Sequence, residues 1–222
     1  MKILILAAME KEMNLLLNLL TEAHERAIGS THFWEGKIDK HQMFIAKCGI
    51  GKVNAAINTY KLIELTKPEL VINSGVAGGA GTPIGTLLIA SQVAYHDVWC
   101  GPGTKYGQAD GLPLFMEPSE IILQIGRQLD LETGLICSGD KFISSAQEIS
   151  DIRSHFPEVK AVDMESASIA QTCIYSGIPF AIIRVISDTP GEGENISQYK
   201  DFWNTAPQKT FAAISNILKE LK

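Results

Sequence analysis

The sequence predicts an α/β protein, a three-layer α/β/α sandwich with a mixed, largely parallel central sheet. Three observations support this prediction. Short apolar runs alternate along the chain with segments whose apolar residues recur at helical spacing. Several runs are apolar at consecutive positions, which is typical of strands covered on both faces. Polar side chains suited to chemistry stand where these strands end, and ligands bind at such ends in α/β folds.

The composition limits the class of protein and its partners. The 222 residues are 45% apolar and 20% charged, enough to bury a full core, so we expect one domain over residues 1–222. The formal net charge is −6 and no run of Lys and Arg follows one face, which argues against nucleic acid as a partner. We expect a small molecule or a second copy of the chain as the partner, and no membrane.

The N-terminal half opens with a strand. The apolar run Lys2–Ala8 is too short for a signal peptide and turns acidic at Glu10. Leucine and methionine at helical spacing then predict a helix over Glu10–Ala23. The other elements expected in this half are a hairpin of His32–Ile38 and Gln42–Cys48 joined at Asp39 and Lys40, a helix over Val53–Thr66, and a short strand over Leu70–Ser74 closed by Gly75.

The C-terminal half continues the alternation and contains the most apolar strand, Pro179–Ser187. Pro157 ends one helix, and Gly177 stands where a helix C-cap favours glycine. The elements expected are strands Leu87–His96 and Glu132–Ser138, helices Pro118–Leu129, Ala146–His155 and Ser166–Tyr175, the strand Pro179–Ser187 and a final amphipathic helix Thr205–Leu221.

Two carboxyl groups at strand ends are candidates for acid and base chemistry. Glu12 falls in the first turn of a helix, where the helix dipole and free amides should keep its pKa low, so that it can accept a proton from water. The alternative is a helix charge facing solvent. Asp188 ends the most apolar strand, where burial raises a carboxyl pKa and suits a general acid. The alternative is a salt bridge with Arg184, four residues earlier on the same strand face.

Other motifs are weaker. Gly49–Lys52 and Asn73–Gly79 are glycine-rich turns whose amides suit an anion or a sugar, although a tight turn beneath a helix is the commoner meaning. Phe142 suits stacking on a planar base, or is core. The cysteines lack metal-ligand spacing and indicate buried thiols in a reducing cytoplasm, and neither a metal nor a cofactor is predicted. They are Cys48, Cys100, Cys137 and Cys173.

Six short segments, in order and at matching separations over nearly the whole chain, resemble the 5'-methylthioadenosine/S-adenosylhomocysteine nucleosidases of the nucleoside phosphorylase superfamily. The resemblance implies that the chain hydrolyses the N-glycosidic bond of both nucleosides and releases adenine and a 5-thioribose product, as in methionine salvage. It implies a homodimer, because part of the 5'-thio pocket in the family comes from a second subunit. The segments are Ala7–Glu12, Cys48–Val53, Asn73–Gly79, Ser138–Ile143, Val162–Glu165 and Arg184–Asp188.

The resemblance also implies a role for each matching residue. Asp188 would protonate N7 of adenine, Glu12 would activate the water that attacks C1', and Glu165 would hold the ribose hydroxyls. Asp163 is left with a structural part. The other implied binding residues are Met164 against the sugar, Phe142 on the purine, the Ile143 backbone at its edge, Gly78 in the glycine-rich loop, Arg184 beside Glu12 and the water, and Met9, Ile50 and Tyr199 in the 5'-thio pocket.

Two departures from the family pattern keep alternatives open. Val76 stands where the family usually has serine, and the loop Val98–Gln108 differs from its common form. A futalosine or aminodeoxyfutalosine hydrolase and a nucleoside-binding protein without turnover are therefore alternatives. A purine nucleoside phosphorylase is a weaker one, because phosphate requires arginines that the Asn73–Gly79 loop lacks and the Glu12 carboxylate would repel it.

Overall fold

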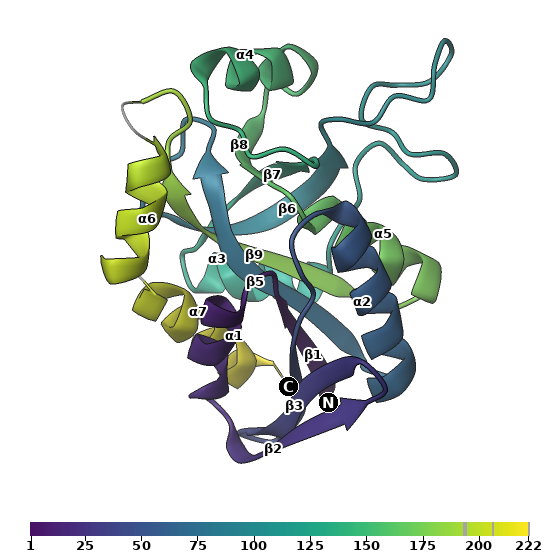
Figure 1. Cartoon of the computed structure of the whole chain (residues 1–222), viewed down its shortest axis with the longest axis vertical. Helices are drawn as coiled ribbons and strands as arrows, with labels where there is room; N and C mark the ends of the chain where they lie inside the picture. Colours follow the sequence, from purple (N-terminus) through teal and green to yellow (C-terminus); the bar gives the residue numbers. More distant parts are fainter. Residues whose placement is uncertain (193–194, 206, 222) are drawn as a thin grey trace.

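A mixed sheet of nine strands runs through residues 1–192, 195–205 and 207–221, the part of the chain that the computed structural model describes (Figure 1). The strand order is β2-β3-β4-β1-β5-β8-β7-β6-β9. Within the described residues no helix is long and apolar enough to span a membrane. The strands are β1 (Lys2–Ala7), β2 (Thr21–Ile28), β3 (Thr31–Ile38), β4 (His41–Lys47), β5 (Leu70–Gly79), β6 (Leu87–Tyr95), β7 (Glu132–Ser138), β8 (Val159–Asp163) and β9 (Phe180–Asp188).

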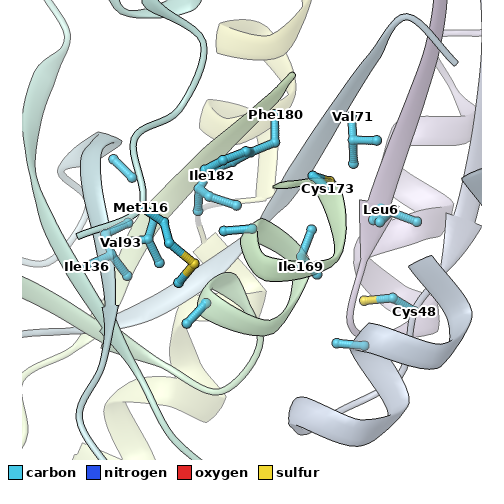
Figure 2. Close-up of a cluster of buried hydrophobic side chains, with 14 of the residues drawn as sticks. Leu6, Cys48, Val71, Val93, Met116, Ile136, Ile169, Cys173, Phe180 and Ile182 are labelled. Atoms are coloured by element: carbon cyan, nitrogen blue, oxygen red, sulfur yellow. The ribbon is translucent and has the colours of Figure 1, made fainter. Parts of the chain in front are cut away.

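Helices cover both faces of this sheet, as the sequence predicts. On β1, Leu4 and Leu6 belong to a buried cluster that includes side chains of α2 and α5 (Figures 1 and 2). Ile3 and Ile5 point to the other face, into a cluster with side chains of α1, α3 and α7. Alternate side chains of one strand therefore supply two cores. The helices are α1 (Glu10–Leu17), α2 (Lys52–Thr66), α3 (Glu120–Gln128), α4 (Ala146–His155), α5 (Ser166–Ser176), α6 (Asn195–Thr205) and α7 (Pro207–Glu220).

The strand pairing confirms a mixed sheet and adds a closure that the sequence did not predict. β1 pairs in parallel with β4 and β5, and β7 with β6 and β8. β9 pairs in parallel with β5 and antiparallel with β6. Because β8 also pairs with β5, the strands β5, β8, β7, β6 and β9 form a closed ring. Closure removes the exposed edges of these strands.

One predicted helix is too long, and three elements were not predicted. The helix expected over Glu10–Ala23 ends at Leu17, and β2 follows it as an exposed strand at the sheet edge. The short strand β8 was not predicted, nor was α6. The final helix is confirmed from Pro207, and Ala206, inside the predicted range Thr205–Leu221, lies outside the described residues.

The prediction for the glycine-rich segment after Ser74 is also wrong. Instead of closing the strand, it continues β5 as far as Gly79. A Cβ atom on Gly79 would lie 2.3 Å from the carbonyl oxygen of Thr82, and one on Gly75 would lie 3.0 Å from Glu12 Oε1. The glycines therefore allow close packing against this strand and do not mark a turn.

Candidate active site

The segments that follow β1, β4, β7 and β8 meet the end of β9 at one cavity, which the second half of β5 also lines. The cavity has a volume of about 170 Å³, and a narrower compartment of about 40 Å³ shares part of its wall. Ile143 lines the narrow compartment. The main cavity is lined by nine of the predicted site residues, which are Met9, Glu12, Ile50, Gly78, Phe142, Met164, Glu165, Asp188 and Tyr199.

Glu12 is 7% exposed and faces the cavity from the first turn of α1. One carboxylate oxygen accepts a hydrogen bond from the Met9 amide at 2.9 Å. Burial raises the pKa of Glu12, while backbone amides, that of Met9 first, and the charge of Arg184 lower it. The expectation that the helix terminus would keep this pKa low is therefore wrong, because desolvation outweighs the amides and the nearby cation. The alternative of a solvent-facing charge is also wrong.

Asp188 is 2% exposed and ends β9 inside the same cavity. Its Oδ1 accepts a hydrogen bond from Ser187 Oγ at 2.6 Å, and its Oδ2 accepts one from Asn195 Nδ2 at 3.2 Å. Burial raises the pKa of Asp188, as predicted, and the two hydrogen bonds lower it in part. A buried carboxyl group with a raised pKa is suited to donate a proton.

The predicted alternative for Asp188, a salt bridge with Arg184, does not form. Ala77 of β5 pairs with Ile186 of β9, but the next residue, Gly78, pairs with Asp188. The extra residue in β9 is a bulge at Ser187, and a bulge re-aims the side chain that follows it. The even spacing of Arg184 and Asp188 therefore does not place them on one face.

Arg184 is the predicted site residue that does not line either compartment. It is 2% exposed and forms an ion pair of 2.8 Å with Asp163. Its guanidinium also donates to the Asn73 side chain and to Ser166 Oγ at 2.9 Å. Asp163 accepts further hydrogen bonds from Ser138 and Ser166. This buried network gives Asp163 the structural part that the sequence assigned to it, although Asp163 also reaches the cavity wall.

Glu165 lies on the wall of the cavity at the start of α5. It accepts a hydrogen bond of 3.0 Å from the Gly51 amide. Gly49 and Gly51 have φ angles of 83° and 87°, so this turn needs glycine, as its sequence predicts. Burial first, and then the charge of Asp163, raise the pKa of Glu165 to about 7. A carboxyl group with this pKa can act both as a donor and as an acceptor of hydrogen bonds near neutral pH.

Aromatic and thioether side chains close the cavity. Phe142 is 42% exposed, so its interpretation as core is wrong, and it lines both compartments. Its ring meets that of Tyr199 edge-on, with centroids 5.9 Å apart. The Tyr199 hydroxyl donates to Met9 Sδ at 3.3 Å. These three residues form an apolar wall suited to a planar ring and to a thioether.

The arrangement places two buried carboxyl groups, Glu12 and Asp188, on the wall of one small cavity. Two buried carboxyl groups with different hydrogen-bond partners are suited to divide acid and base work. No group of three or more His, Cys, Asp or Glu side chains placed to hold a metal occurs among the described residues. The cysteines are unpaired, and three are buried as predicted, whereas Cys100 is exposed because it lies in the irregular loop after β6.

The chain is similar to known proteins over its whole length. The sequence profile of the phosphorylase superfamily matches residues 2–219. A 5'-methylthioadenosine/S-adenosylhomocysteine nucleosidase of Exiguobacterium sp. is 40% identical over an alignment that covers 100% of this chain and 99% of the relative. This chain belongs to the 5'-methylthioadenosine/S-adenosylhomocysteine nucleosidases of the phosphorylase superfamily. The family that the six sequence segments predict is thus confirmed.

Two solved structures with similar chains confirm the fold. S-adenosylhomocysteine nucleosidase from Streptococcus pyogenes, in complex with 5-methylthiotubericidin, matches with a TM-score of 0.95 at 34% identity and covers 100% of this chain and 98% of its own. A futalosine hydrolase mutant of Helicobacter pylori matches with a TM-score of 0.91 at 30% identity and covers 99% of both chains. The predicted nucleoside phosphorylase-like α/β fold is confirmed.

Sequence reasoning missed some lining residues of this nucleosidase cavity. Val76, noted only as a departure from the family, lines the cavity and packs against Val185 and Phe202. Its place in the glycine-rich segment was one signal, and the other missed residues, which are small or apolar, also lie inside the six family segments. They are Ala8, Ala77, Val162 and Ser187.

Proposed function

We propose that the chain hydrolyses the N-glycosidic bond of 5'-methylthioadenosine and S-adenosylhomocysteine and releases adenine. The observation that carries the proposal is the pair of buried carboxyl groups, Glu12 and Asp188, on one cavity whose wall also holds Glu165. The named nucleosidase relatives give the substrate class.

Each carboxyl group has one part in the reaction. Asp188 gives its proton to N7 as the bond between C1' and N9 breaks and its electron pair moves into the adenine ring. A water molecule attacks the electron-poor C1', and Glu12 takes the proton of that water. Because Asp188 works protonated and Glu12 works ionised, the rate rises as Glu12 ionises and falls as Asp188 ionises.

The wall of the cavity assigns parts of the substrate to its regions. Glu165 holds the ribose hydroxyls, and Met164 packs against the sugar. Phe142 stacks on the purine, and Ile143 and Gly78 bring backbone to the purine end. Met9, Ile50 and Tyr199 line the region for the 5'-thio group. Arg184 acts from behind the wall through Asp163 and through its charge on Glu12.

Water is the nucleophile in this proposal, and phosphate is not. No lysine or arginine is among the described residues that line the main cavity, and a phosphate dianion needs such cations. Glu12 would repel the anion at the position where it must attack. The proposal therefore excludes phosphorolysis as the main reaction.

We further propose that the active form is a cytoplasmic homodimer of this one-domain chain. Apolar side chains are exposed on one face of α2, at Val53, Ile57 and Tyr60, and beside it at Tyr175, which lines the same surface hollow as Val53. Exposed apolar patches of this kind mark protein interfaces. Ile50, 51% exposed at the cavity mouth, precedes α2, so a second copy on this face would complete the 5' end. Sedimentation equilibrium tests the dimer, and a monomer at micromolar concentration contradicts it.

An adenine-release assay tests the reaction. It compares 5'-methylthioadenosine, S-adenosylhomocysteine, 5'-deoxyadenosine and aminodeoxyfutalosine, with and without phosphate. We expect turnover of the two thioethers at a rate that phosphate does not change. Preference for aminodeoxyfutalosine would favour the second candidate function, which the similarity to a futalosine hydrolase supports. No turnover of any substrate would favour a binding protein.

A further inference from the structure

The Asn195 side chain lies behind the purine end of the cavity and bonds both Asp188 and the Ile143 backbone there, although it does not line the cavity itself. It is the first residue of α6 and is 5% exposed. Its side-chain amide nitrogen donates to Asp188 Oδ2 at 3.2 Å and to the carbonyl oxygen of Ile143 at 3.4 Å. Asp188 is the acid of the proposed reaction, and Ile143 lies where the purine edge is read.

The two oxygens of Asp188 depend on donors of different origin. Oδ1 accepts from Ser187, its neighbour in β9, at 2.6 Å. Oδ2 accepts from Asn195, which reaches it from α6. A carboxyl group can rotate about its last bond unless both oxygens are held. The donor on α6 is therefore what fixes the plane of the Asp188 carboxyl group.

We propose that Asn195 is a positioning residue, which orients the Asp188 carboxyl group toward the purine and fixes its distance from the Ile143 backbone by one hydrogen bond to each. This inference rests on the proposed function, in which Asp188 protonates the leaving base. It gives α6, an element that the sequence did not predict, a part in the proton transfer.

The surroundings of Asp188 make the effect of Asn195 measurable. The other titratable groups on the two compartments are Glu12 from α1, Asp163 and Glu165 from β8 and α5, Tyr199 from α6, and Lys141 from the loop after β7. The pKa of Asp188 is raised by burial and lowered by Ser187 and Asn195. Loss of the Asn195 donor should thus raise this pKa, because the bond favours the ionised form.

Gln198 provides a matched control on the same helix. Its side chain accepts from the Thr189 amide at 3.0 Å and donates to the Glu192 carbonyl at 3.3 Å. Gln198 therefore ties α6 to the segment after β9, whereas Asn195 ties it to the last residue of β9 and to the loop after β7. Gln198 has no hydrogen bond to Asp188 among the described contacts. A role in docking the helix alone would make the two residues equivalent.

The experiment compares Asn195→Leu with Gln198→Leu in the full chain, with adenine release from 5'-methylthioadenosine as the readout. We expect Asn195→Leu to lower kcat about tenfold, because the variant loses a hydrogen bond to the carboxylate that forms as Asp188 gives up its proton. Its alkaline limb of kcat/KM should move to higher pH by about one unit. In Gln198→Leu the alkaline limb of kcat/KM should stay at the same pH as in the parent. Asn195→Ala takes the place of the leucine variant if that variant does not fold.

Two negative outcomes have different meanings. An active parent whose Asn195 and Gln198 variants share one pH profile and one kcat overturns the positioning role alone. A parent that releases no adenine overturns the proposed function. In that case the pH titration of Asp188, followed by NMR in both variants, still tests the contact, and an equal Asp188 pKa in both contradicts it.

Discussion

Glu12 and Asp188 are buried carboxyl groups of one cavity, and they differ in what holds them. Glu12 is held by backbone amides near the turn between β1 and α1, with the charge of Arg184 close behind. Asp188 is held by two side chains, Ser187 and Asn195, whose hydrogen bonds partly offset the rise in its pKa caused by burial. The Glu12 carboxyl group is thus held by backbone and charge, whereas the Asp188 carboxyl group is held by side chains.

Because of this difference, Glu12 and Asp188 should respond to different kinds of substitution. Backbone donors persist through most substitutions, so the Glu12 end should respond mainly to changes in charge or in space. The Asp188 end depends on hydrogen bonds from two elements, so it should respond to single side-chain donors. The predictions that follow test this division, from the largest expected effect to the smallest.

Arg184→Met tests the charge behind the Glu12 end. It leaves Asp163 buried without its cation, and we expect the free energy of unfolding to fall by about 3–5 kcal/mol. The pKa of Glu12 should rise, so the acid limb of kcat/KM moves to higher pH, while the alkaline limb set by Asp188 stays in place. Denaturant titration and the pH profile measure both effects.

Arg127→Met is the control, because Arg127 forms an exposed ion pair with Glu120. We expect a stability change below about 1 kcal/mol and an unchanged pH profile. Equal losses of stability in the two variants would contradict the importance of the buried network. A shift of both limbs in Arg184→Met would contradict the separation of the two ends.

Glu165→Gln tests the raised pKa of the third carboxyl group on the cavity wall. The folded-state pKa of about 7 exceeds the ordinary value of 4.5, so the folded protein keeps a proton that the unfolded chain has released. The stability from this proton is complete below pH 4.5 and is lost as the pH rises through 7. Glutamine cannot ionise, so the variant should be more stable than the parent at pH 8, by about 3 kcal/mol, and should lose most of this advantage near pH 5.

Glu148→Gln should change the stability at pH 8 in the opposite direction. Lys141 and the amide of Ser144 lower the pKa of Glu148 to about 2, so its ionised form stabilises the fold above its ordinary pKa. This variant should be less stable than the parent at pH 8. Melting curves at pH 5 and pH 8 test both variants. A Glu165→Gln variant that is less stable than the parent at pH 8 would contradict the raised pKa of Glu165.

Gly75→Ala tests the space at the Glu12 end. The added Cβ atom would lie 3.0 Å from Glu12 Oε1, closer than most real contacts of this kind, so the carboxylate must shift. We expect kcat to fall about tenfold, because misplaced catalytic groups lose rate before they lose binding. In Gly78→Ala the Cβ atom would meet Pro190 and Val162, away from Glu12. Steady-state kinetics should show a larger kcat loss for Gly75→Ala.

The sequence predicts most of the fold, because strand and helix periodicities are strong where both faces of the sheet are covered. It fails where local signals are weak. β2 is an exposed edge strand without apolar alternation, and β8 has only five residues. Closure of the ring depends on β9 pairing with β5 and β6 at once, which no local pattern encodes.

The sequence predicts which residues line the cavity better than it predicts their ion pairs and pKa values. Strand-end positions and the family resemblance point to Glu12 and Asp188, and both line the cavity. The partner of Arg184 and the pKa of Glu12 could not be read from spacing. The first depends on a one-residue bulge in β9, and the second depends on how deeply the tertiary structure buries the first turn of α1.

The division between acid and base is tested most directly with a substrate that needs no acid. In 4-nitrophenyl 5-methylthioriboside the leaving group departs without protonation, so only the activation of water should remain necessary. We predict that Asp188→Asn loses at least about 100-fold in kcat on 5'-methylthioadenosine but stays within about tenfold of the parent on the nitrophenyl substrate. Glu12→Gln should be impaired on both. Equal loss of Asp188→Asn on the two substrates would contradict the account.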